Sequence, residues 1–181
     1  MSARSYSRRQ LMSFKLPYDA EIEYLQSTGT QWIDTEYRSD NTNAIELTVV
    51  TDGTSGFMGS NGNLQMDLTL SKELGKRTMM VTHSKNIGPK TYVNGSLVKS
   101  QNYHKYNGYI IALFAMGKSG TTVGENTRAK VYSSELRVGN ITVRDLIPVR
   151  VGNVGYMYDK VSKQLFGNAG TGSFILGPDK H

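Results

Sequence analysis

The sequence predicts an all-β domain in which antiparallel strands form a sandwich or a barrel. About a dozen short runs have strand-like patterns, with roughly one run in every ten residues. Asn-Gly, Asp-Gly and glycine-rich turns separate these runs, and such turns typically join antiparallel strands. No segment of convincing length repeats its apolar residues with the period of a helix. No fixed-length repeat is visible, which argues against a propeller or a solenoid.

The composition favours a single thin, two-layer β domain. The chain has 181 residues, which is enough to bury a substantial core. Apolar residues make up 38% of it, a low share that fits strands with one face in water. The 19 glycines and 11 tyrosines suit many short strands and turns.

Cysteine is absent, which excludes disulfides, thiolate zinc sites and cysteine nucleophiles. Its absence also favours assembly in a reducing cytoplasm. No apolar run approaches the roughly 20 residues that span a bilayer, so we expect no membrane contact. The first residues, MSARSYSRRQLMSFKLP, lack the apolar core of a secretion signal.

Residues 131–177 give the clearest local predictions. Gly139-Asn140 joins two β-rich runs, and Gly152-Asn153 forms a second turn after Pro148. We expect the following runs, GYMYD and QLFGN, to form a shorter hairpin. The closing GNAGTGSF is so rich in small residues that its backbone must turn sharply or lie close against another segment.

Other strands are predicted by alternation and by apolar runs. EIEYLQ begins the pattern at Glu21, and YIIALFAM is expected to form one buried central strand. LQMDLTL follows a hairpin turn at Asn61-Gly62 and is predicted to be a strand along its whole length. Trp32 is expected in or near the core. The remaining predicted strands are QWIDTEY, AIELTVV, SGFMGS, KRTMMVTH and the hairpin KTYVNGSLVKS around Asn94-Gly95.

Residues 1–20 read as a basic N-terminal arm that precedes a domain over residues 21–181. The arm holds half of the net charge of +6, and Pro17 would end any short helix in it. Two interpretations are open: a disordered tail, or an arm that becomes ordered on a partner. The second gives a set of docking residues, in which basic side chains steer and apolar side chains anchor: Arg4, Arg8, Arg9, Leu11, Phe14 and Leu16.

Three segments resemble a known family: EIEYLQSTGTQWIDTEY, TYVNGSLV and VYSSELRVGNITVRDLIPVRVGNVGYMYDKVSKQLFGNAGTGSF. They are similar to the concanavalin A-like, laminin-G-like jelly-roll domains of bacteriophage structural proteins and gut-bacterial surface proteins. The resemblance runs from about Glu21 to Gly177 and leaves out the arm. It implies a two-sheet antiparallel jelly-roll sandwich whose first and last strands are adjacent, with a binding or structural role rather than a catalytic one.

A glycosidase of this fold needs two carboxylates that face each other across the scissile bond. Glu21 and Glu23 have a suitable i, i+2 spacing, but they are interpreted as a solvated strand face, and we expect no other such pair on a strand. No catalytic triad suits His83, His104 or His181, and His83 and His104 are expected at the surface. The sequence therefore predicts no catalytic residue and no enzyme activity.

No bound cofactor or metal is predicted either. The glycine-rich stretches lack the order of a phosphate-binding loop, and there is no acidic calcium loop. A calcium site built from scattered oxygens stays open, but turn capping accounts for Asp52 and Asp159. We do not expect nucleic acid as a partner, because no recognition motif accompanies the dispersed basic residues.

Glycan binding is the alternative ligand hypothesis. Sugars stack on exposed aromatic rings, and the loop around Tyr103, Tyr106 and Tyr109 also carries two asparagines. The structural alternative is that these tyrosines pack their rings at the edge of the sandwich and hydrate their hydroxyls.

The resemblance and the arm together predict a non-enzymatic bacteriophage virion structural protein. It would be a capsid decoration or tail-associated protein, assembled in the bacterial host cytoplasm and docked onto other virion proteins through its arm. The alternative is a glycan-binding adhesion module for host attachment, on the virion or on a bacterial cell surface.

Overall fold

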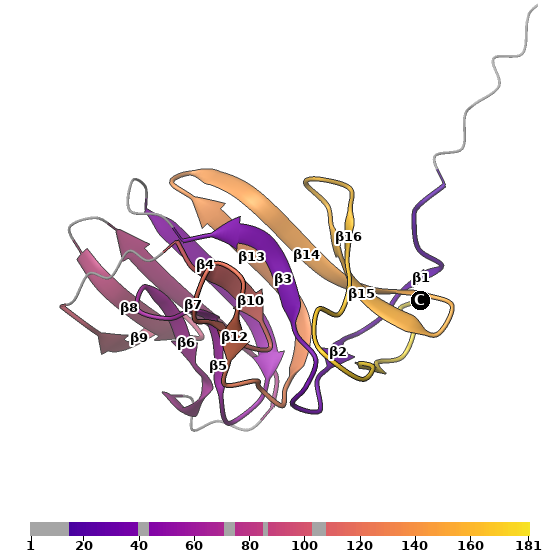
Figure 1. Cartoon of the computed structure of the whole chain (residues 1–181), viewed down its shortest axis with the longest axis horizontal. Coiled ribbons are helices and arrows are strands. Elements are labelled where there is room, and N and C mark those ends of the chain that lie inside the picture. The colour runs from indigo at the N-terminus through magenta and orange to yellow at the C-terminus, as the bar shows by residue number, and fades with distance from the viewer. Residues whose placement is uncertain (1–14, 40–43, 71–74, 85–86, 103–107) are drawn as a thin grey trace, which may run out of the picture.

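The computed structural model describes residues 15–39, 44–70, 75–84, 87–102 and 108–181. Over these residues the chain is all-β, as predicted, and its only helical element is the 3-10 turn η1 (Leu68–Leu70). The strands form two sheets that share one core, which fits a β-sandwich (Figure 1). No helix in the described part of the chain is long and apolar enough to cross a membrane.

The larger sheet contains eleven strands. Two pairings bring the two ends of the domain side by side: β1 (Ala20–Glu21) pairs with β14 (Ile141–Val151), and β2 (Leu25–Gln26) pairs with both β13 (Lys130–Val138) and β17 (Ile175–Leu176) (Figure 1). The main path of the sheet runs, in spatial order, through β16 (Leu165–Phe166), β15 (Val154–Asp159), β14 (Ile141–Val151), β13 (Lys130–Val138), β4 (Ile45–Asp52), β7 (Arg77–Ser84), β8 (Ile87–Val93) and β9 (Ser96–Ser100). The three short strands beside it are β1 (Ala20–Glu21), β2 (Leu25–Gln26) and β17 (Ile175–Leu176).

The smaller sheet contains six strands, and all of its pairs are antiparallel except β11 with β5. Its main path runs through β12 (Val123–Gly124), β11 (Met116–Gly117), β5 (Phe57–Ser60), β10 (Ile110–Leu113) and β3 (Ile33–Arg38), and β6 (Leu64–Asp67) pairs with β5.

The turns predicted from sequence join the strands that they were expected to join. Gly139-Asn140 connects β13 to β14, and Gly152-Asn153 connects β14 to β15. Asn94 and Gly95 connect β8 to β9 with φ values of 48° and 82°. A hairpin turn with two left-handed residues matches the natural twist of its strands, which explains the Asn-Gly pair.

Three expected strands are interrupted. EIEYLQ divides into β1, which pairs with β14, and β2, which pairs with β13. YIIALFAM divides into β10 and β11 because Phe114 between them has a φ of 63°, which turns its ring into the core at 5.0 Å from the ring of Phe174. LQMDLTL is a strand only to Asp67. The Asp67 carboxylate then accepts hydrogen bonds from the backbone N–H and hydroxyl of Thr69, and this local capping begins η1.

The core lies between the sheets, and the long strand β4 contributes to it by strict alternation. In β4, Ile45, Leu47 and Val49 are buried while the residues between them are partly exposed. Trp32 packs against this core from its margin, as expected. The closing glycine-rich segment lies close against the residues that precede β3, also as expected, because a Cβ on Gly170 would overlap the Thr30 carbonyl oxygen.

Candidate functional site

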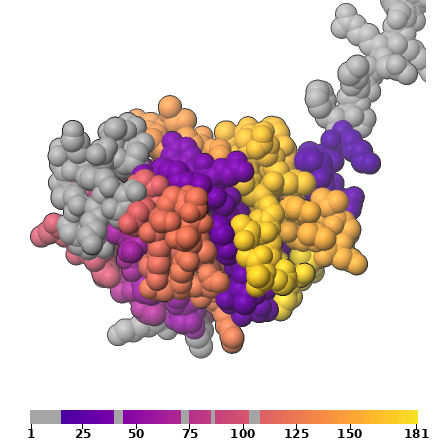
Figure 2. Space-filling model, viewed as in Figure 1, coloured from indigo at the N-terminus to yellow at the C-terminus, as the bar shows by residue number. Residues whose placement is uncertain are grey.

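The described N-terminal residues are fixed to the larger sheet before the first strand begins. The backbone N–H of Asp19 donates to the Arg150 carbonyl at 2.9 Å, and the Asp19 carboxylate accepts from the Gly152 N–H at 2.7 Å. Ala20, which the expected boundary places in the arm, already belongs to β1. The chain therefore enters the domain at the β14–β15 turn. Figure 2 places these indigo residues at the margin of the molecule, beside the orange hairpin.

Tyr18 anchors this entry point. Its ring meets the buried ring of Tyr158 edge to face, with centroids 5.0 Å apart, and its hydroxyl donates to Glu21 at 3.3 Å. Burial raises the pKa of Tyr18, and the charge and hydrogen bond of Glu21 raise it further. Tyr18 therefore stays uncharged near neutral pH, and its ring holds the entering chain against Tyr158.

Leu16, by contrast, is 52% exposed. It lines a hollow of about 560 Å³ together with Lys15, Pro17, Tyr158 and Lys163, which we call the Leu16 groove. A second hollow is also lined by Lys15, Leu16 and Pro17, and it extends to Val151 in the β14–β15 hairpin. The groove thus combines an apolar floor with two lysines at the point where the chain enters the domain.

Acidic residues near this end of the sheet are already held by donors. Asp179 accepts two hydrogen bonds from Arg150, at 2.7 and 2.6 Å, and Arg150 lowers the pKa of that carboxyl. Asp145 forms an ion pair with Lys160 at 2.8 Å. Across the described ranges, neither lysine of the Leu16 groove forms an ion pair. The groove therefore has a net positive rim.

Asp159 caps the β15–β16 turn, as its sequence context predicted. Its buried carboxylate accepts from the backbone N–H groups of Asp145, Val161 and Ser162 and from the Ser162 hydroxyl. Burial acts to raise the pKa of Asp159, but these hydrogen bonds outweigh it and lower the pKa. Asp52 ends β4, and its charge adds to burial in raising the pKa of Tyr132. Among the described residues, no three acidic or histidine side chains gather as metal ligands would.

The prediction that His83 lies at the surface was wrong. It is 2% exposed, at the position of β7 that follows Met79 and Val81 on the inner face. The two-residue period of the strand carries this polar ring inward, and the local hydropathy gave no sign of it. His181 is exposed, and His104 lies outside the described residues.

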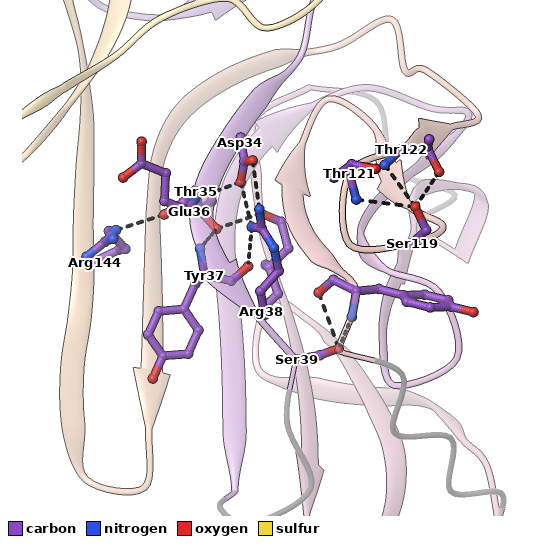
Figure 3. A network of polar contacts seen from close by, with 12 residues as sticks. Asp34, Thr35, Glu36, Tyr37, Arg38, Ser39, Ser119, Thr121, Thr122 and Arg144 are labelled. Atoms are coloured by element: carbon purple, nitrogen blue, oxygen red, sulfur yellow. Dashed lines mark hydrogen bonds and ion pairs between the residues drawn. The ribbon is translucent and has the colours of Figure 1, made fainter.

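A second pair of carboxylates, which the sequence reasoning missed, stands at i, i+2 on β3. Asp34 forms an ion pair with Arg38 at 3.0 Å and accepts from the Glu36 N–H at 2.7 Å (Figure 3). Glu36 has a φ of 57°, and Figure 3 shows its carboxylate directed away from Asp34. The two do not face a common space. Of the pair singled out from sequence, Glu23 is exposed and lies outside β1, whereas Glu21 is half-buried on β1 and lies 3.9 Å from Lys180.

Most of the remaining predicted contact residues lie outside the part of the chain that the structure describes. Arg4, Arg8, Arg9, Leu11, Phe14, Tyr103 and Tyr106 lie outside the described residues. Tyr109 is half-buried, and its backbone exchanges hydrogen bonds with Ser39.

Sequence reasoning also missed a hollow of about 270 Å³, lined by both polar and apolar residues, at one end of the larger sheet. Glu46, Thr82 and Lys90 lie in register there on β4, β7 and β8, and Tyr92 lies beside them. A long, a short and a long side chain in one row leave a notch above Thr82. Only the pairing of these strands brings the three residues together, so the hollow could be predicted only once the strand order is known.

Comparison with known proteins adds no relative: no family model, curated protein or solved structure matches this chain.

Proposed function

We propose that this protein is a non-enzymatic virion structural protein, a capsid decoration or tail-associated component that docks at its N-terminal end. The observation that carries the proposal is the exposed Leu16 beside the Leu16 groove, where the chain enters the domain. Leu16 belongs to the apolar anchors expected from sequence. A half-exposed leucine in a hollow has apolar surface that a partner can bury.

The fold supports the same proposal. The last strand, β17, pairs with the second strand, β2, so strands from the two ends of the domain lie together, as a concanavalin A-like jelly roll would have them. Such a sandwich holds its entry point rigid, because Asp19 and Ala20 are hydrogen-bonded into the larger sheet. An arm that precedes residue 15 would therefore transmit attachment directly to the domain.

The test is removal of residues 1–14 only, since residues 18–20 are part of the sheet contacts. We expect the shortened chain to fold with an unchanged thermal transition and to lose binding to particles produced without the native protein. The matched control is the full chain with Leu97→Ser and Val98→Ser, two exposed apolar residues on the far edge strand β9. Occupancy of the shortened chain equal to that of the full chain would contradict the proposal.

A second candidate function, glycan binding by an adhesion module on the virion or on a bacterial cell surface, is favoured by the hollow beside Tyr92. A pyranose ring can stack on the tyrosine while Glu46 and Thr82 hydrogen-bond its hydroxyls. The hollow approaches the lower end of the roughly 300 to 1,000 Å³ that is common for ligand sites.

This candidate predicts saturable binding on a glycan array. We expect Tyr92→Ala to weaken the signal about tenfold, through loss of stacking worth about 1.4 kcal/mol. Tyr109→Ala tests the loop expected from sequence, and Ile141→Ser, at an exposed turn, is the control. An array without signal, probed with folded protein, would exclude this function.

A further inference from the structure

We infer that the Leu16 groove binds an acidic, apolar segment of a partner protein. This inference rests on the proposed docking function and names the chemistry of the surface that it docks to. Three features of the groove carry it: exposed apolar side chains, uncompensated lysines and a rigid floor.

The apolar surface continues beyond the groove onto the β14–β15 hairpin. Val151 is 37% exposed and Val154 is 55% exposed, and the two residues are direct cross-strand partners. Partners in an antiparallel pair have their side chains on the same face. Val151 also lines the hollow that adjoins the groove, so Leu16 and this valine share one surface. Exposed apolar residues that gather in this way mark an interaction site.

The charge of the groove identifies the occupant as acidic. Lys15 and Lys163 line it and form no ion pair in the described part of the chain. No carboxylate lines the groove itself, and that of Asp19, which lines the adjoining hollow, accepts the Gly152 N–H. Complementary charge across an interface steers association and selects partners.

The same charge argues against the chain's own arm, or the arm of a second copy, as the occupant. Residues 1–14 contain three arginines and no acidic residue. Placing this segment between Lys15 and Lys163 would bring like charges together, which is destabilising. An acidic partner segment would instead be attracted by the arm and by both lysines.

The floor of the groove is held in place before any partner arrives. The Tyr158 ring is 5% exposed and is braced by Tyr18. The Lys163 N–H donates to the Asp159 carbonyl at 2.8 Å, which fixes the turn that carries the lysine. A preformed surface loses little conformational entropy on binding.

The test measures binding of the full chain to a short fluorescent peptide that alternates glutamate with leucine, by anisotropy at low and high salt. A peptide with lysine in place of glutamate is the probe of opposite charge. We expect the glutamate peptide to bind and to weaken with salt. The double substitution Lys15→Glu with Lys163→Glu should weaken binding of the glutamate peptide about tenfold and strengthen binding of the lysine peptide. Lys99→Glu with Lys118→Glu, on the edge strand β9 and directly after β11, should leave the binding of both peptides unchanged, because neither lysine lines the groove.

Leu16→Ser with Val151→Ser tests the apolar part, and we expect it to weaken the glutamate peptide at high salt as well as at low salt. The inference is overturned if the wild-type chain binds neither peptide, binds both equally, or is indifferent to charge reversal in the groove. Self-association that charge reversal abolishes would also overturn it. If these results are negative while removal of residues 1–14 still abolishes particle binding, only this inference fails. If the peptide binds as expected and that removal has no effect on particles, the proposed function fails instead.

Discussion

Strands β14 and β15 pair from Leu146 with Asp159 to Val151 with Val154 without a shift in register. In the smaller sheet, β10 and β3 pair at Ile110 with Arg38 and next at Ala112 with Asp34. Between these pairs the chain advances two residues along β10 but four along β3, so the register shifts there. The first region is joined by a turn that is open to solvent. The second contains residues with positive φ that are not glycine, among them Glu36 and Phe114. The contrast separates structure set by local turn chemistry from structure set by tertiary contacts.

The largest expected effect comes from glycines in the two regions. Gly59 in β5 has a φ of 92°, and a Cβ there would overlap the Leu64 carbonyl oxygen. Gly59→Ala should therefore destabilise the fold by about 3 to 5 kcal/mol, through steric overlap and a strained backbone. At Gly152, in the β14–β15 turn, the added Cβ would meet open space, so the same substitution should cost only about 1 kcal/mol. Urea unfolding measures both, and equal costs would remove the distinction between the regions.

Asp159 gives the next largest effect, because it secures the regular region. Its folded-state pKa lies below the ordinary value of 3.8. The stabilisation is complete above that value and is lost as the pH falls through the folded pKa. Asp159→Asn keeps one acceptor oxygen and removes the charge, so it should cost about 2 kcal/mol at neutral pH.

Thermal unfolding of the wild type and of Asp159→Asn from neutral to acidic pH checks this prediction. The difference between the two proteins should shrink as the pH falls below 3.8. Asp145→Asn removes an exposed ion pair with Lys160 and should change stability by less than about 0.5 kcal/mol. A difference that does not depend on pH would show that the Asp159 charge contributes nothing.

The regular region could be predicted from sequence because its signals are local. Gly139-Asn140 and Gly152-Asn153 encode their turns in two residues, and the side chain of Asp159 caps its own turn. The irregular region could not be predicted. Phe114 leaves the β conformation because its ring packs on Phe174, sixty residues away in the chain.

The candidate site was predictable only in part, for the same reason. Leu16 stands out in sequence as an apolar residue in a basic segment, but Tyr158 and Lys163 join it only through the pairing of β1 with β14. Val151 has no sequence signal of exposure, since it ends a strand of apolar alternation. Its role in the groove follows from the place where the hairpin meets the N-terminal residues.

The smallest effect tests the strain in the smaller sheet directly. Glu36 is exposed and has a φ of 57°, a conformation that costs a residue with a side chain about 1 kcal/mol. Glu36→Gly should therefore stabilise the protein by about 0.5 to 1 kcal/mol, with a small offset from the greater flexibility of the unfolded chain. Glu46→Gly, in the regular strand β4, should instead cost about 1 kcal/mol. The two changes remove the same side chain, so opposite signs in denaturant unfolding would isolate the backbone conformation as the cause. Destabilisation by both would mean that the Asp34 and Arg144 contacts around the bend, rather than its backbone conformation, decide its stability.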